Sequence, residues 1–138
     1  MLLGFKSRFV EPILIGTKVF TLRSPRKKEP KIGETLYMYT GLRTNQCKKI
    51  TDKESLRSVQ MCDVYIIRHN EIDTIKVRVD GRRLTAFELG RFVKYDGFKD
   101  TKDFADYWIS TSYAPKKAPA NCHVSGSMNL YHWTDLKY

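Results

Sequence analysis

The residues best suited to chemistry lie in the stretch Gly16–Arg23, which carries a lysine, a threonine and an arginine at close spacing. Apolar residues recur at helical spacing before it, and Gly16 falls where a left-handed residue commonly ends a helix. The side chains after it alternate with the period of a strand. Lys18 and Thr21 would then lie on opposite faces, so a bend between Gly16 and Val19 is needed to bring the ammonium beside the hydroxyl.

Two interpretations of this stretch are open from the residues alone. A lysine after a helix commonly complements the negative end of the helix dipole, and threonine is a good strand former. Alternatively, a lysine whose pKa is lowered by its surroundings can act as a general base toward a hydroxyl or a water molecule. Under the second interpretation, Lys18 and Thr21 are candidate catalytic residues.

Asp96 is a third candidate catalytic residue. Thr85–Glu88 has the form of a capping box followed by apolar positions, which predicts a helix that ends near Asp96 and Gly97. A carboxylate at this end faces the negative pole of the helix dipole, which is unfavourable unless it serves a purpose. The alternative is an exposed aspartate that helps to form the turn.

Basic residues point to a polyanionic partner, because 25 Lys and Arg oppose 15 Asp and Glu and give a net charge of +10. Arginine offers a planar fork suited to phosphate, and an exposed tyrosine can stack on a base or simply cover a sheet. The loop Ser24–Lys31 is either a phosphate-contacting or a solvated segment. The candidate nucleic-acid-binding residues are Arg23, Arg26, Lys27, Lys28, Tyr39 and Arg43.

The pattern G-x-K-x-x-T-x-R over Gly16–Arg23 resembles the signature of the ASCH domain family, whose fold is similar to the PUA barrels that bind RNA. Asp96-Gly97-Phe98, followed by a helix with Phe104 and Trp108, resembles a second element of the family. Tyr39-Thr40-Gly41 followed by Arg43-Thr44 and Cys47 is similar to a bacterial and phage branch. The resemblance covers residues 5–108.

This resemblance implies possible roles for particular residues. Small bacterial members of the family act as N4-acetylcytidine amidohydrolases, in which a lysine, a threonine and a glutamate are implicated in catalysis. The matching positions are Lys18, Thr21 and Asp96, where the aspartate is one methylene shorter than the family's glutamate. Other bacterial members resemble ribonucleases.

The predicted fold is a single α+β domain over residues 1–138: a small, mostly antiparallel, PUA-like β-barrel of about six strands with two to four helices. A helix is expected over Lys6–Ile15 and two more after Thr85 and Asp100, a turn or single helical turn over Thr51–Glu54, and a long loop over Ser110–Ser127. Period-two patterns and a hairpin signal at Asp80-Gly81 predict the strands, which are Leu2–Phe5, Val19–Arg23, Thr35–Gly41, Ser58–Arg68, Ile72–Val79 and Met128–Thr134.

Other functional classes lack a signal. No apolar run has the length of a membrane span and no leader pattern opens the sequence, so we expect a cytoplasmic protein that does not bind membranes. Cys47, Cys62 and Cys122 have no spacing typical of disulfides or zinc, and we expect no metal or other cofactor.

Two functions are therefore expected. The first is binding of RNA or a nucleotide in a basic cleft, and the alternative is hydrolysis of a nucleoside or RNA by Lys18, Thr21 and Asp96. Nothing in the sequence indicates a protein partner.

Overall fold

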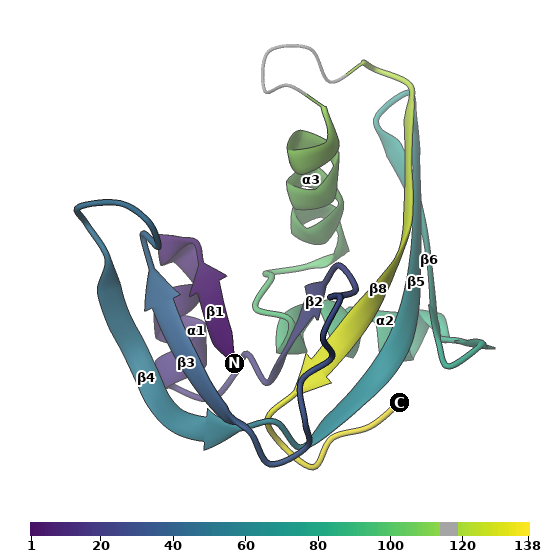
Figure 1. Ribbon diagram of the computed structural model, residues 1–138. Helices are drawn as coiled ribbons and strands as arrows, with labels where there is room; N and C mark the ends of the chain where they lie inside the picture. Colours follow the sequence, from purple (N-terminus) through teal and green to yellow (C-terminus); the bar gives the residue numbers. More distant parts are fainter. Residues whose placement is uncertain (114–118) are drawn as a thin grey trace.

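The computed structural model describes residues 1–113 and 119–138, whose strands form two sheets (Figure 1). In the three-stranded sheet, β3 (Thr35–Thr40) pairs in parallel with β1 (Leu2–Phe5) and antiparallel with β4 (Lys48–Ser55). The five-stranded sheet is antiparallel and has the order β2-β8-β5-β6-β7. Its strands are β2 (Phe20–Arg23), β5 (Ser58–His69), β6 (Ile72–Val79), β7 (Arg82–Arg83) and β8 (Cys122–His132).

The helices cover one face of each sheet. A 3-10 turn (Ser7–Phe9) leads into the short α1 (Val10–Leu14), whereas α2 (Ala86–Tyr95) and α3 (Thr101–Ser112) pack on the same face of the five-stranded sheet. Phe20 of β2 contacts Phe92 of α2 at a centroid distance of 4.9 Å, and Arg68 of β5 pairs with Asp106 of α3 at 2.6 Å. The other face of β5, β6 and β8 is left open. None of the described helices is long and apolar enough to span a membrane.

The α+β class is confirmed, but the described strands do not close into the expected six-stranded barrel. The chain passes from β4 to β5 through the buried Leu56, whose N–H and C=O both bond the backbone of the loop before β3. Among the described residues, β1 and β2 are not paired through their backbones. Arg23 of β2 instead donates to the carbonyl oxygen of Gly4 in β1 at 2.6 Å, so a side chain links the two sheets at this edge.

Two local predictions were wrong. Residues 51–54 belong to β4 rather than to a turn, because the edge of β3 supplies backbone partners that a local pattern does not reveal. The predicted loop Ser110–Ser127 is shorter at both ends: α3 continues to Ser112 and β8 begins at Cys122. Its central part, residues 114–118, lies outside the described residues. The strand β8 is longer than its apolar positions predict, because its backbone pairs with β5 from Cys122 to His132.

Candidate functional site

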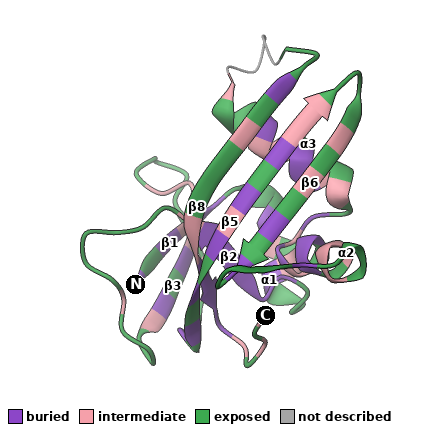
Figure 2. Ribbon diagram, turned by 90° about the vertical axis from the view of Figure 1, so that its right-hand side faces the viewer, coloured by how far each residue is buried: buried purple, intermediate pink, exposed green. Residues whose placement is uncertain are grey.

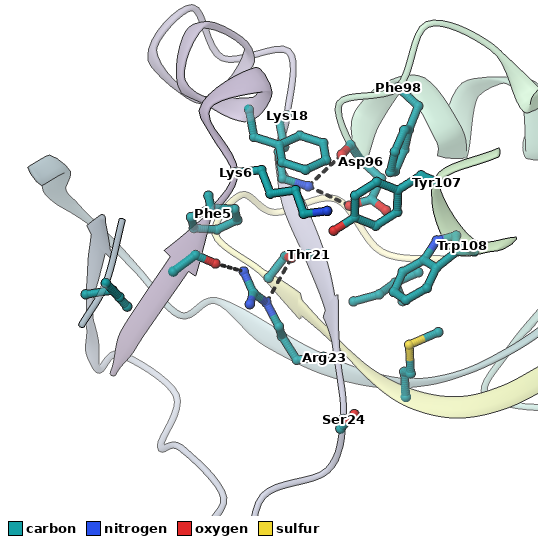
Figure 3. Close-up of a pocket in the computed structure, with 15 residues that line it drawn as sticks. Phe5, Lys6, Lys18, Thr21, Arg23, Ser24, Asp96, Phe98, Tyr107 and Trp108 are labelled. Carbon is teal, nitrogen blue, oxygen red and sulfur yellow. Dashed lines mark hydrogen bonds and ion pairs between the residues drawn. The ribbon is translucent and has the colours of Figure 1, made fainter. Parts of the chain in front are cut away.

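A pocket of about 430 Å³ opens at the free edge of β2, between β1, the 3-10 turn, the segment after α2, and α3 (Figure 3). It gathers residues that are far apart in the sequence, including the three candidate catalytic residues. The polar and charged side chains that line it are Lys6, Lys18, Thr21, Arg23, Ser24 and Asp96. The aromatic side chains are Phe5, Phe9, Phe98, Tyr107 and Trp108.

Local backbone geometry positions the Lys18 side chain in this pocket. Gly16 adopts the predicted left-handed conformation, with φ of 82°, and ends α1. The N–H groups of Thr17 and Lys18 both donate to the carbonyl of Pro12, and the N–H of Val19 donates to the carbonyl of Tyr95. The required bend is thus present, and it fixes Lys18 against the end of α2.

Lys18 and Asp96 form a buried ion pair, with only 2% and 3% of the two residues exposed. The Lys18 Nζ donates to Asp96 Oδ1 at 2.6 Å and to the Asp96 carbonyl oxygen at 2.5 Å. It also lies 4.7 Å from the centroid of the Phe9 ring, within cation–π range. The shorter aspartate therefore reaches the lysine, and it does not project into solvent.

Gly97 makes this close approach possible. Its φ is 90°, and a Cβ at this position would lie 3.0 Å from Lys18 Cδ and 3.0 Å from Phe9 Cδ1. Any other residue would therefore meet both a strained backbone conformation and two crowded side chains.

Burial shifts the pKa of each partner in the direction that favours its neutral form. It lowers the pKa of Lys18 and raises the pKa of Asp96, and the attraction between the two charges opposes both shifts. The proton that they share is therefore held less firmly by the lysine than in a solvated pair. This is the electrostatic setting in which a lysine can act as a base.

Arg23 carries a second cation at the pocket. Its Nε donates to Thr21 Oγ1 at 3.3 Å, and its guanidinium carbon lies 4.8 Å from the centroid of the Phe5 ring. Burial lowers the pKa of Arg23, and among the described residues no carboxylate forms an ion pair with it. Its guanidinium therefore retains donors for an anionic ligand.

Aromatic rings form the opposite wall. Tyr107 contacts Phe98 and Trp108 at centroid distances of 5.1 and 5.4 Å, and Lys6 Nζ lies 5.0 Å from the centroid of the Tyr107 ring (Figure 3). Sequence reasoning did not name Lys6 or Tyr107 as site residues, and it named Trp108 only as part of the family's second element. Helical spacing alone does not distinguish this wall from the core, because the adjacent Phe104 and Ala105 of the same helix are both fully buried.

The other candidate binding residues lie outside this pocket. Arg26, Lys27 and Lys28 are exposed on the loop before β3, where Arg26 donates to the carbonyl oxygen of Leu2 at 3.1 Å. Arg43 is exposed in a loop, and Tyr39 is half-buried on β3. Only Arg23 of the predicted nucleic-acid-binding set is brought together with the candidate catalytic residues.

No model of a known protein family matches this chain, and no solved structure matches it significantly. The chain is similar to Protein FAM161A of Xenopus laevis, at 25% identity over 118 residues. The match covers 83% of this chain and 16% of that protein, so the chain spans about a sixth of its length. This distant similarity does not assign the chain to a family.

Proposed function

We propose that this chain binds nucleic acid or a nucleotide, with one base in the pocket at the edge of β2. The observation that carries the proposal is the buried Lys18–Asp96 pair at the base of an aromatic-walled pocket. A pocket of about 430 Å³ is in the range of small-ligand sites. Aromatic walls suit the flat face of a base, and the charged pair offers polar groups to its edge.

Charge supports a ligand that carries phosphate. Three cations, Lys6, Lys18 and Arg23, line the pocket against one carboxylate, that of Asp96. Lys18 is engaged by Asp96, whereas the guanidinium of Arg23 has donors to spare for a phosphate oxygen. We therefore assign the base to the wall near Tyr107 and Trp108, and the phosphate to Arg23 and Lys6.

We also propose that the chain is a divergent ASCH domain with a PUA-like fold. The support is the convergence of the two motif segments that carry the resemblance: Lys18 and Thr21 come from one, Asp96 comes from the other, and all three line one pocket. The five-stranded antiparallel sheet with two helices on one face is compatible with this assignment.

Binding can be tested through Trp108. The chain has two tryptophans, and Trp133 is buried against Phe5, so a Trp133→Phe variant leaves Trp108 as a single reporter at the pocket. We expect nucleoside monophosphates to quench its fluorescence, and Arg23→Gln to weaken a monophosphate more than the matching nucleoside. Failure of nucleosides, nucleotides and short RNA alike to change the signal, supported by calorimetry, would refute the proposal.

A second candidate function is hydrolysis of a nucleoside amide, favoured by the lowered pKa of Lys18, which lines the same pocket as Thr21. Neutral Lys18 would accept a proton from Thr21 or from a water molecule, whose oxygen adds to the amide carbonyl carbon. The C–N bond would then break, and the departing nitrogen would take the proton from Lys18. Where Thr21 is the nucleophile, the acyl group stays on its oxygen until a water molecule, deprotonated by Lys18, adds to the ester and Thr21 leaves with that proton. Asp96 would orient the amine of Lys18. Cleavage of RNA is the corresponding reaction at phosphorus.

The Lys18→Arg variant distinguishes between the two proposed functions, hydrolysis and binding alone. Arginine keeps the positive charge but does not lose its proton near neutral pH, so hydrolysis should fall at least about a hundredfold while binding is largely retained. The assay is chromatography of N4-acetylcytidine and of labelled RNA after incubation with each protein. Binding without detectable turnover by the unmodified protein would remove the hydrolase and leave the module.

A further inference from the structure

The face of the five-stranded sheet on the side away from α3 is turned toward the viewer in Figure 2. It carries a second set of aromatic and basic side chains. We call it the outer sheet face and define it by Tyr65, Lys76, Arg78, His123, Ser125 and Ser127. Strand register places these side chains together, because Tyr65 is paired with both Lys76 and Ser125, and Asp63 with both Arg78 and Ser127. Side chains of directly paired residues project from the same face.

The opposite side of these strands is covered, which fixes the orientation of the outer sheet face. Arg68 of β5 pairs with Asp73 and with Asp106 of α3. Residues at every second position from Arg68, such as Val64 and Ile66, project from the same face of the sheet and are buried beneath the helix. The side chain of Tyr65 projects from the opposite face of the sheet, and Tyr65 is 38% exposed. The outer sheet face is therefore a surface without a cover among the described residues.

Its chemistry combines stacking with positive charge. The centroids of the Tyr65 and His123 rings are 4.8 Å apart and their planes are inclined by 59°, so two aromatic rings lie side by side on this face. A hollow of about 500 Å³ beside it is lined by Lys76, Arg78, Ser125 and Ser127. Lys76 and Arg78 form no ion pair with the described residues, and Arg78 is paired in register with the exposed Arg83 on one side and with Asp63 on the other.

We propose that the outer sheet face binds single-stranded nucleic acid, with a base stacked on Tyr65 and phosphates at Lys76 and Arg78. Aromatic rings on a sheet beside unpaired cations match the two requirements of single-strand binding, which are stacking on an unpaired base and attraction of the backbone. Two cations, Lys76 and Arg78, line the hollow against one carboxylate, that of Asp63, which accepts a hydrogen bond from Ser127 at 2.5 Å. The excess of positive charge therefore favours a polyanion.

This site is distinct from the pocket at the edge of β2, so the two can be tested separately. A fluorescently labelled 12-nucleotide single strand, as RNA and as DNA, is titrated with each protein and followed by anisotropy. Tyr65→Ala should weaken binding about tenfold, because one stacked base is lost. Tyr37→Ala is the matched control, since Tyr37 is 46% exposed on β3 of the other sheet.

Charge is tested with the double variant Lys76→Gln and Arg78→Gln. It should reduce the slope of log K against log salt by about 1.4, because two phosphate contacts are lost from a single strand. Lys48→Gln with Lys53→Gln removes the same charge from the exposed surface of β4 and should leave the slope nearly unchanged. Quenching of Trp108 by a mononucleotide should be unaffected by all these variants, which distinguishes failure of this site from failure of the pocket.

Three outcomes would overturn the proposal. The first is that Tyr65→Ala weakens the single strand no more than Tyr37→Ala does. The second is equally tight binding of a duplex that is insensitive to Tyr65, which would indicate charge alone. The third is concentration-dependent dimerisation that Tyr65→Ala abolishes, since the exposed Val59 and Met61 continue this face and could pair two copies.

Discussion

The pocket at the edge of β2 and the outer sheet face carry the same kinds of side chain in opposite environments. In the pocket, burial lowers the pKa of Lys18, and the attraction of Asp96, which bonds it at 2.6 Å, opposes that shift. On the outer sheet face, Lys76 and Arg78 are exposed to solvent. Aromatic rings lie beside the cations in both regions. The difference teaches that Lys18 is part of the folded core, whereas Lys76 and Arg78 lie on the surface, where they can contact a ligand without disturbing the core.

The largest expected effect is on the buried pair. Lys18→Met or Asp96→Leu alone leaves an unpaired buried charge and should reduce the free energy of unfolding by about 3–5 kcal/mol. The double variant should recover most of this loss, because two apolar side chains can replace a buried ion pair. Urea denaturation of the three variants measures the coupling.

The control for this cycle is the exposed pair of Lys49 and Asp52 on β4, whose atoms are 3.1 Å apart. Alanine at either position should change the stability too little to resolve. If the Lys18 and Asp96 variants behaved like these controls, the contrast between the two environments would be wrong.

The next effect concerns two histidines on β8. His132 is fully buried and its Nε2 lies 3.0 Å from Gln60 Oε1, whereas His123 is exposed on the outer sheet face. Burial lowers the pKa of His132 to about 4. The unfolded chain therefore binds more protons between about pH 6.5 and 4, so stability should fall through that window as the pH is lowered.

The loss attributable to His132 is about 3 kcal/mol, since each unit of pKa difference corresponds to about 1.4 kcal/mol. It is measured by urea denaturation at several pH values. His123→Gln should leave the pH dependence intact, while His132→Gln should flatten it. A flat profile in the unmodified protein would show that His132 can be protonated without cost in the fold.

A smaller effect is expected at Gly97, which touches Lys18 and Phe9. Gly97→Ala combines a left-handed alanine with the two 3.0 Å contacts, so it should cost about 2 kcal/mol and weaken ligand binding in the pocket. Gly81→Ala is the matched control, because its φ of 82° is similar and its added Cβ has open space. Equal costs at both positions would mean that the crowding around Lys18 is relieved easily.

Local signals in the sequence predicted much of the frame. Thr85 and Glu88 form the capping box with reciprocal hydrogen bonds, and Asp80 and Gly81 both adopt positive φ in the predicted hairpin turn. Gly16 ends α1 as expected. These features depend on a few neighbouring residues, so the sequence contains the information needed to predict them.

Features that depend on distant partners were harder to predict. The convergence of Lys18 and Asp96 followed from the family resemblance, because a separation of 78 residues carries no local signal. Lys6 was missed because its place over Tyr107 depends on the packing of α3 against the 3-10 turn. The division into two sheets likewise depends on which strands pair across the chain, which the strand patterns do not specify.

The smallest expected effect is at the loop that carries Arg26, Lys27 and Lys28, which is exposed like the outer sheet face. If these residues contact phosphates of RNA, replacing all three with glutamine should reduce the slope of log K against log salt by about 2, with a modest loss of affinity at low salt. Because the three residues lie outside the pocket, quenching of Trp108 by a mononucleotide should not change. Anisotropy of labelled RNA across a salt series measures the slope. A slope equal to that of the unmodified protein would assign the loop to the solvated surface and leave Lys76 and Arg78 as the exposed cations that contact RNA.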